Sequence, residues 1–87
     1  MRIGSFVVSL SGRDEGKIMI VLANEGEYLF LVDGKERKVE KPKKKKVKHA
    51  ALLDYFEEDT ASEIESGSLS NKMARDAVRR AVEWLQN

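Results

Sequence analysis

The sequence predicts a mainly β protein with a helical tail at its C-terminal end. Over the first 50 residues, short apolar and β-branched segments alternate with glycine-bearing turns, and no helix is expected between them. After residue 50, apolar residues recur at helical spacing instead. The chain has 87 residues, which limits it to one small domain with a small core. We therefore expect a small antiparallel barrel or sandwich over residues 1–50, followed by an acidic linker and helical tail over residues 51–87.

Five short strands account for the β part. The first three are expected at residues 5–10, 17–23 and 28–32, each bounded by a polar turn that contains glycine. Asp33-Gly34 is typical of a type I′ hairpin turn, so residues 36–39 are expected to run back as a fourth strand. Pro42 cannot donate a ladder hydrogen bond and marks the end of that strand. A short fifth strand is expected at residues 47–49.

The tail is expected to contain two helices. Thr60 and Glu63 have the spacing of a capping box, and Gly67 ends the short helix that they would start. Ser70 or Asn71 caps a second helix, expected over residues 71–86. Its apolar stripe consists of Met73, Ala74, Ala77, Val78, Ala81, Val82 and Leu85. On its polar side, Asp76 with Arg80 and Arg79 with Glu83 have the spacing of i,i+4 ion pairs.

The second and third strands are nearly continuous in apolar residues, which is typical of strands buried on both faces. One face fills the interior of the barrel, so another element is needed to cover the other face. The apolar stripe of the last helix can do this within one chain. A contact between two copies in a homodimer would serve equally well.

Charge is unevenly distributed along the chain. Residues 1–50 hold twelve Lys and Arg against seven Asp and Glu, whereas residues 51–87 hold four against eight. Between Lys35 and Lys48, nine basic residues accompany only Glu36 and Glu40. Such a run indicates a solvated linker, an electrostatic footprint for a polyanion such as nucleic acid, or a nuclear-import signal.

The sequence lacks the residues that most catalytic and metal sites need. There is no cysteine, and His49 is the only histidine, so we expect no transition-metal site and no cofactor. The segment Gly12–Lys17 does not match a phosphate-binding P-loop, since Ile18 stands where Ser or Thr is required. We expect a non-enzyme. With no membrane span or signal segment in the sequence, we also expect a cytoplasmic location.

The first strand, its loop and the next strand resemble a known motif. Gly4, Val7-Val8-Ser9, Ser11-Gly12-Arg13-Asp14-Glu15-Gly16-Lys17 and Ile20-Val21 are similar to the KOW motif of ribosomal proteins and transcription elongation factors. Leu31 to Lys35, Arg37 to Val39 and Pro42 to His49 extend the similarity. Over residues 3–50 the chain resembles small bacterial KOW-domain RNA-binding proteins, which are related to the KOW-type large-subunit ribosomal proteins of archaea and eukaryotes.

The resemblance implies an SH3-like five-stranded antiparallel barrel that binds RNA, in particular ribosomal RNA, in or near the ribosome. Ribosomal proteins are additional partners on this interpretation. The glycines let the loop backbone approach a ligand, and the basic side chains offer donors to phosphate oxygens. Asp14 is expected to brace the loop through a local backbone bond. The expected RNA-binding residues are Gly12, Arg13, Gly16, Lys17, Lys35, Arg37, Lys38, Lys41, Lys43, Lys44, Lys45, Lys46 and Lys48.

A second interpretation belongs to another class of function. SH3-like barrels and KOW domains also bind proteins, so the chain is alternatively a protein-interaction adaptor, for example in the transcription and translation machinery. The acidic second half and the stripe of the last helix would then form the interface. Binding that falls steeply with salt and depends on residues 35–48 favours the RNA interpretation, whereas dependence on the helix favours the adaptor.

Overall fold

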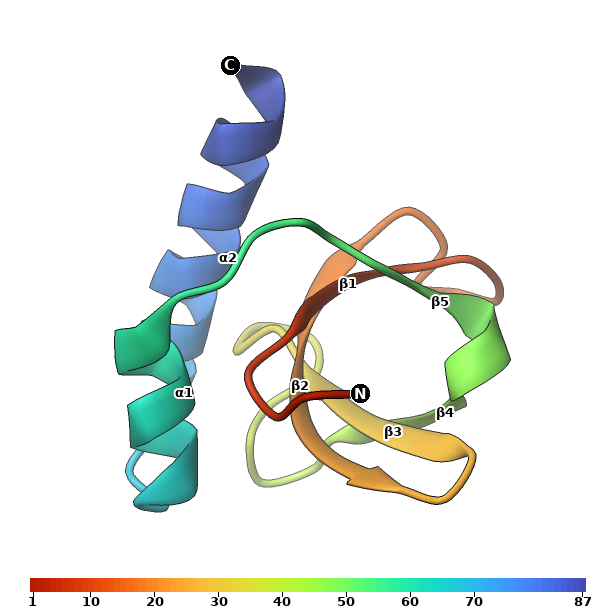
Figure 1. The fold of residues 1–87 in the computed structure, drawn as a ribbon, viewed down its shortest axis with the longest axis horizontal. Helices are drawn as coiled ribbons and strands as arrows, with labels where there is room; N and C mark the ends of the chain where they lie inside the picture. Colours follow the sequence, from red (N-terminus) through yellow and green to blue (C-terminus); the bar gives the residue numbers. More distant parts are fainter.

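The computed structural model describes all residues 1–87, as a five-stranded antiparallel sheet followed by two helices (Figure 1). The strands are β1 (Phe6–Ser9), β2 (Ile18–Glu25), β3 (Tyr28–Val32), β4 (Lys43–Lys46) and β5 (Ala50–Leu52). A 3-10 turn, η1 (Val47–His49), joins β4 to β5, and the helices are α1 (Glu58–Glu65) and α2 (Asn71–Gln86). The expected mainly β fold with a helical tail is confirmed.

The strand order across the sheet is β4-β3-β2-β1-β5. The first three strands form a meander, and β5 returns to pair with the free edge of β1. The sheet curls so that η1 carries the chain from the β4 edge to the β5 edge (Figure 1). No ladder joins β4 to β5, so the sheet is not closed.

The fourth strand lies later in the chain than the sequence pattern indicates. The prediction of a strand at residues 36–39 is wrong, because residues 33–42 form a loop. Strand β4 instead consists of four lysines that pair with β3. Lysine has low strand propensity, but it is common on edge strands, where its charge discourages further pairing. The strand expected at residues 47–49 is also wrong, since this segment is η1 and β5 begins at Ala50.

The type I′ turn at Asp33-Gly34 does not form. That turn needs positive φ at both residues, and only glycines have positive φ in this protein. The Asp33 carboxylate instead accepts hydrogen bonds from the backbone amides of Lys35 and Arg37, at 2.9 and 2.8 Å. These bonds hold the 33–42 segment as a loop rather than a hairpin.

The sheet has an apolar cluster on each face. The inner cluster fills the curl of the sheet with Val7, Met19, Val21, Leu29 and Leu31, all fully buried. The outer cluster lies between the sheet and α2 and contains Phe6, Ile18, Ile20, Val32, Ala74, Ala77 and Ala81. Successive side chains of β1 and β2 therefore alternate between two buried clusters, which explains their unbroken apolar sequence.

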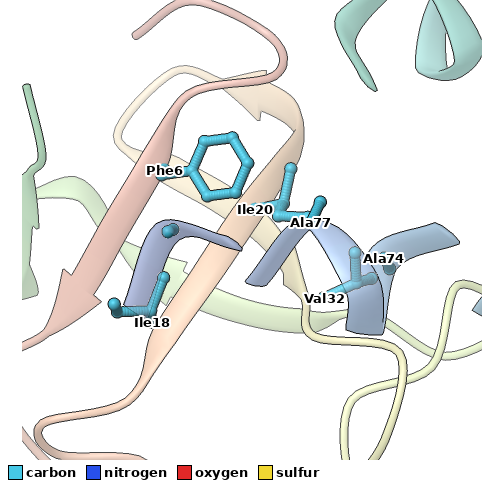
Figure 2. Packing of buried hydrophobic residues seen from close by; sticks show 7 residues of the cluster. Phe6, Ile18, Ile20, Val32, Ala74 and Ala77 are labelled. Carbon is cyan, nitrogen blue, oxygen red and sulfur yellow. The ribbon is translucent and has the colours of Figure 1, made fainter. Parts of the chain in front are cut away.

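Helix α2 covers the outer face of the sheet with three alanines. Ala74 and Ala77 face Phe6, Ile20 and Val32 in Figure 2, and these alanines are fully buried. Small side chains let the helix backbone approach the sheet closely, which favours dense packing. The expectation that the chain's own last helix covers the sheet is confirmed. Leu85, also part of the expected stripe, is 48% exposed in the single chain, because the last turns of α2 extend past the sheet (Figure 1).

The start of α2 and the end of α1 lie where the sequence predicts them. Ser70 caps α2 by accepting a hydrogen bond from the Met73 amide at 3.1 Å, and α1 ends just before Gly67 with φ of +71°. The expected capping box at Thr60 is wrong, because α1 begins at Glu58 and Thr60 lies inside it. The Thr60 hydroxyl donates instead to Glu57 Oε1 at 2.7 Å.

Glu57 ties the linker before α1 to α2. Its carboxylate accepts two hydrogen bonds from the Arg80 guanidinium, at 2.9 and 2.8 Å, and one from the Tyr55 hydroxyl. The expected pair between Asp76 and Arg80 is therefore wrong, and Asp76 pairs with Lys72 and Arg79 instead. Arg79 is engaged there, so its expected pair with Glu83 is not formed either. We call Glu57, Tyr55, Thr60 and Arg80 the Glu57 cluster.

The N-terminal end of α2 packs directly on the 33–42 loop. Gly34 has φ of +77°, and a Cβ atom placed on it would lie 2.2 Å from the Asn71 carbonyl oxygen. Arg75 donates to the Gly34 carbonyl at 2.9 Å, and the Asn71 side chain accepts from the Val39 amide at 2.9 Å. Glycine is thus required at position 34 both for its backbone conformation and for this close approach.

Replacing Gly34 with alanine should destabilise the protein by about 3 kcal/mol, as the sum of left-handed backbone strain and overpacking against α2. Gly26→Ala is the matched control, because Gly26 has φ of +59° but open space around its Cβ position. We expect it to cost only about 1 kcal/mol. Urea denaturation of both variants measures the difference, and equal losses would contradict the close approach of Gly34 to α2.

The Glu57 cluster should make stability depend on pH under acid conditions. Burial alone would raise the pKa of Glu57, but hydrogen bonds from Arg80, Tyr55 and Thr60 lower the pKa to about 2, from an ordinary value of 4.5. The stabilisation is therefore complete above pH 4.5 and is lost as the pH falls towards 2. Because Arg80 is half exposed, we expect a loss on the order of 1–2 kcal/mol. In Glu57→Gln, denaturation curves recorded across this range should lose that part of the pH dependence, and an unchanged profile would contradict the assignment.

Candidate nucleic-acid interface

The segment between β1 and β2, residues 10–17, forms a compact loop, which we call the β1–β2 loop. Gly12 and Gly16 have φ of +76° and +83°, in the region that favours glycine. Backbone bonds from Gly16 to the Ser9 carbonyl and from Lys17 to the Asp14 carbonyl close it, at 2.8 and 2.9 Å. The tight turning expected of the two glycines is thus present.

The β1–β2 loop is joined to the basic segment, residues 35–48, at three points. The Arg37 guanidinium donates two hydrogen bonds to Asp14 Oδ2, at 3.2 and 3.0 Å. Lys17 pairs with Glu36, and Lys45 Nζ donates to the Ser11 carbonyl at 2.9 Å. Two regions distant in the sequence are therefore joined, and together they contain all thirteen residues expected from the sequence.

Asp14 braces this surface from within. Its residue exposure is only 3%, and its charge is balanced by Arg37. A bracing role is the one expected from the sequence, but the partner is a distant guanidinium rather than a local backbone amide. Arg37, an expected RNA ligand, is thereby held in a structural ion pair.

Several other expected ligands also have partners inside the protein. Glu36 accepts a hydrogen bond from Lys17 and raises the pKa of that ammonium group. Lys46 pairs with Glu27 at 3.6 Å, and Lys44 Nζ lies 4.4 Å from the centre of the Tyr28 ring. Lys45 is buried. These side chains are less free to meet a ligand than their place in a lysine run indicates.

The other basic residues of the surface have no side-chain partner in the protein. Neither a salt bridge nor a side-chain hydrogen bond involves Arg13, Lys35, Lys38, Lys41, Lys43 or Lys48. In the tail, by contrast, Lys72, Arg79 and Arg80 pair with carboxylates, and Arg75 donates to a backbone carbonyl. We call the six unpartnered residues the free cations.

Two features of the surface were not expected from the sequence. Tyr28 lies beneath Lys44, and Lys45 turns inward toward the β1–β2 loop. Both follow from β4 being a strand, since side chains then alternate between two faces. The lysine run becomes a strand by pairing with the apolar β3, and no local sequence signal predicts that pairing.

Asp14→Ala should destabilise the protein by about 1–3 kcal/mol, because it leaves the partly buried Arg37 guanidinium without its acceptor. Glu15→Ala removes an equal charge from the next, exposed position, which takes part in no salt bridge, and should change stability by less than about 0.5 kcal/mol. Urea denaturation compares the two. A similar small effect from both variants would mean that Asp14 does not brace the loop.

No helix is long and apolar enough to cross a membrane, and no group of three or more His, Cys, Asp or Glu side chains is placed to hold a metal ion. No family model matches the sequence, and no curated protein matches it either. The functional assignment therefore rests on the chemistry of the surface formed by the β1–β2 loop and the basic segment.

Proposed function

We propose that this chain is a non-catalytic RNA-binding protein that holds structured RNA, ribosomal RNA in particular, on the surface formed by the β1–β2 loop and the basic segment. The observation that carries the proposal is the position of the free cations. All six belong to the β1–β2 loop or to the basic segment joined to it, while every Lys and Arg of the tail has an internal partner.

Electrostatics supports a polyanionic partner. Unpaired like charges on one surface repel one another and lower the stability of the folded chain. A ligand with regularly spaced phosphates relieves this repulsion and releases its own counterions on binding. Cations already paired with carboxylates would gain much less, so the free cations are the ones that we assign to phosphate contacts.

The fold is consistent with this function. We assign the sheet to the SH3-like barrel class, on the basis of the order β4-β3-β2-β1-β5 and the 3-10 turn between β4 and β5. The similarity of β1, its loop and β2 to the KOW motif supports the same assignment. On this proposal the protein works in the cytoplasm, in association with the ribosome and its proteins.

The surface favours recognition of RNA shape over sequence. Phe6 is buried in the outer cluster, and Tyr28 is covered by Lys44, so neither offers a free ring for base stacking. Cationic side chains contact the phosphate backbone, which is the same in every sequence.

Replacing four free cations, in the variant Lys38→Gln/Lys41→Gln/Lys43→Gln/Lys48→Gln, should weaken binding to structured ribosomal RNA. If all four touch phosphates, the log–log salt slope should flatten by about 3, from a contribution of roughly 0.7–0.9 per contact. Fluorescence anisotropy titrations at several salt concentrations measure both quantities. Stability should barely change, because these side chains have no partners to lose.

The matched control is Arg2→Gln/Lys46→Gln/Lys72→Gln/Arg79→Gln, which removes the same charge from cations that already have carboxylate partners. Its salt slope should stay close to that of the unmodified protein. Equal losses in the two variants would show that only net charge matters and that the free cations form no defined interface.

One observation favours the adaptor as the second candidate. Val82 and Leu85, about one turn apart at the end of α2, are 37% and 48% exposed, and Trp84 on another side of the helix is 40% exposed, which leaves exposed apolar side chains at the far end of the tail. Unchanged RNA affinity in the four-residue variant of the free cations would place the adaptor first.

A further inference from the structure

The outer face of the sheet carries two aromatic side chains that lie outside both apolar clusters. Leu29 and Leu31 of β3 belong to the inner cluster, so Tyr28 and Phe30 lie on the opposite, outer face. Both are half-buried, and neither is part of the inner or the outer cluster. Strand β3 runs toward α2, so its beginning at Tyr28 lies away from the helix that covers the rest of this face (Figure 1).

Lysines of β4 lie beside these two rings. The strand register pairs Tyr28 with Lys46 and Phe30 with Lys44, and residues directly opposite each other share a face of the sheet. Lys44 is exposed, and its Nζ lies 4.4 Å from the centre of the Tyr28 ring. This part of the outer face therefore combines two aromatic rings with two ammonium groups.

That combination matches a ligand with both flat rings and negative charge. In proteins that bind single-stranded nucleic acids, bases stack on aromatic side chains while cations follow the backbone. An apolar protein segment would desolvate the lysines without supplying an opposite charge. Glu25, the register partner of Tyr28, and Glu27 are the acidic residues at this end of β3. Glu27 is already paired with Lys46, so positive charge predominates.

The contact between Lys44 and Tyr28 can be exchanged when RNA binds. A cation–π contact at an exposed site is weaker than a charge-assisted hydrogen bond to phosphate. A bound nucleotide can therefore draw the ammonium group to its phosphate and leave the ring to its base. The Tyr28 hydroxyl makes no hydrogen bond within the protein that would add a second contact to be broken.

We propose that Tyr28, Phe30 and Lys44 form a stacking platform for an unpaired base of the bound RNA. The platform rests on the proposed function and specifies the part of the RNA that this face takes, a single-stranded loop or bulge. The free cations Lys43 and Lys48, on either side of Lys44 in the sequence, contact neighbouring phosphates. Stacking accepts every base, since each has a flat face, so the platform adds no strict sequence preference.

Two RNAs with the same number of phosphates test the platform, a hairpin with an unpaired loop and a fully paired duplex. In fluorescence anisotropy titrations, Tyr28→Leu should weaken hairpin binding about tenfold, through the loss of one stacked base, and leave duplex binding unchanged. Tyr28→Phe keeps the ring and should bind both RNAs like the unmodified protein. Trp84→Leu, which removes an exposed ring from α2, is the matched control and should change neither affinity.

Lys44→Gln tests the exchange of the ammonium group. If Lys44 moves to a phosphate, this variant should flatten the log–log salt slope for the hairpin by roughly 0.7. Lys46→Gln is the matched control, because the Lys46 ammonium already has a carboxylate partner, and its slope should equal that of the unmodified protein. An unchanged slope in Lys44→Gln would contradict the exchange.

Two results from the hairpin and the duplex would overturn the platform. One is unchanged hairpin binding by Tyr28→Leu when thermal unfolding shows the variant folded, and the other is an equal loss for both RNAs. If either result comes with tight binding by the unmodified protein, the proposed function stands without the platform. Absence of binding to both RNAs contradicts the function and the platform together.

NMR of the unmodified protein tests the platform even if Tyr28→Leu does not fold. Titration with a short unstructured RNA should shift the ring-proton signals of Tyr28 and Phe30 upfield, because a stacked base shields them. Ring signals that do not move while the RNA binds elsewhere would overturn the platform.

Discussion

The rest of the structure depends on a sheet whose two faces are both apolar. Such a sheet cannot face water on its outer side, so the tail has to lie against it, and Ala74, Ala77 and Ala81 make that approach close. Once α2 is seated, its first turn reaches the 33–42 loop, where Asn71 and Arg75 hold the backbone near Gly34 and Val39. The same loop carries Arg37, which reaches Asp14 in the β1–β2 loop. A continuous series of contacts thus leads from the buried alanines to the candidate interface.

Elements whose signal is local were predictable from the sequence. The first three strands are short apolar runs bounded by turns, and α2 has a clear helical period, so their residues determine them without reference to a distant partner. Strand β4 has no such signal, because four lysines become a strand only by pairing with the apolar β3. The loop before it escaped prediction for a similar reason. Asp33 and Gly34 have the composition of a hairpin turn, but backbone amides of the loop and the nearby helix decide their conformation.

The composition of the candidate site was predictable, but the state of each charge was not. The sequence places Lys17 and Glu36 nineteen residues apart, and only the fold brings them into contact. Asp14 and Arg37 are likewise distant in sequence, and both are lost as free charges when they pair. A count of charges along residues 35–48 therefore overstates what is available to a ligand.

The charged side chains of the candidate interface have different physical roles, which depend on whether each has a partner in the protein. Pairs such as Asp14 with Arg37 add rigidity and bring the loops together, but they attract a polyanion weakly because their fields largely cancel. The free cations extend an uncancelled field into solvent, which raises the rate and strength of encounter with phosphates. Lys45 belongs to neither group, since it is held in place yet uncompensated. Its ammonium group is fixed by the Ser11 carbonyl, so it stabilises the contact between β4 and the β1–β2 loop. On the proposed function, the exposed lysines supply an attraction that any phosphate backbone would feel.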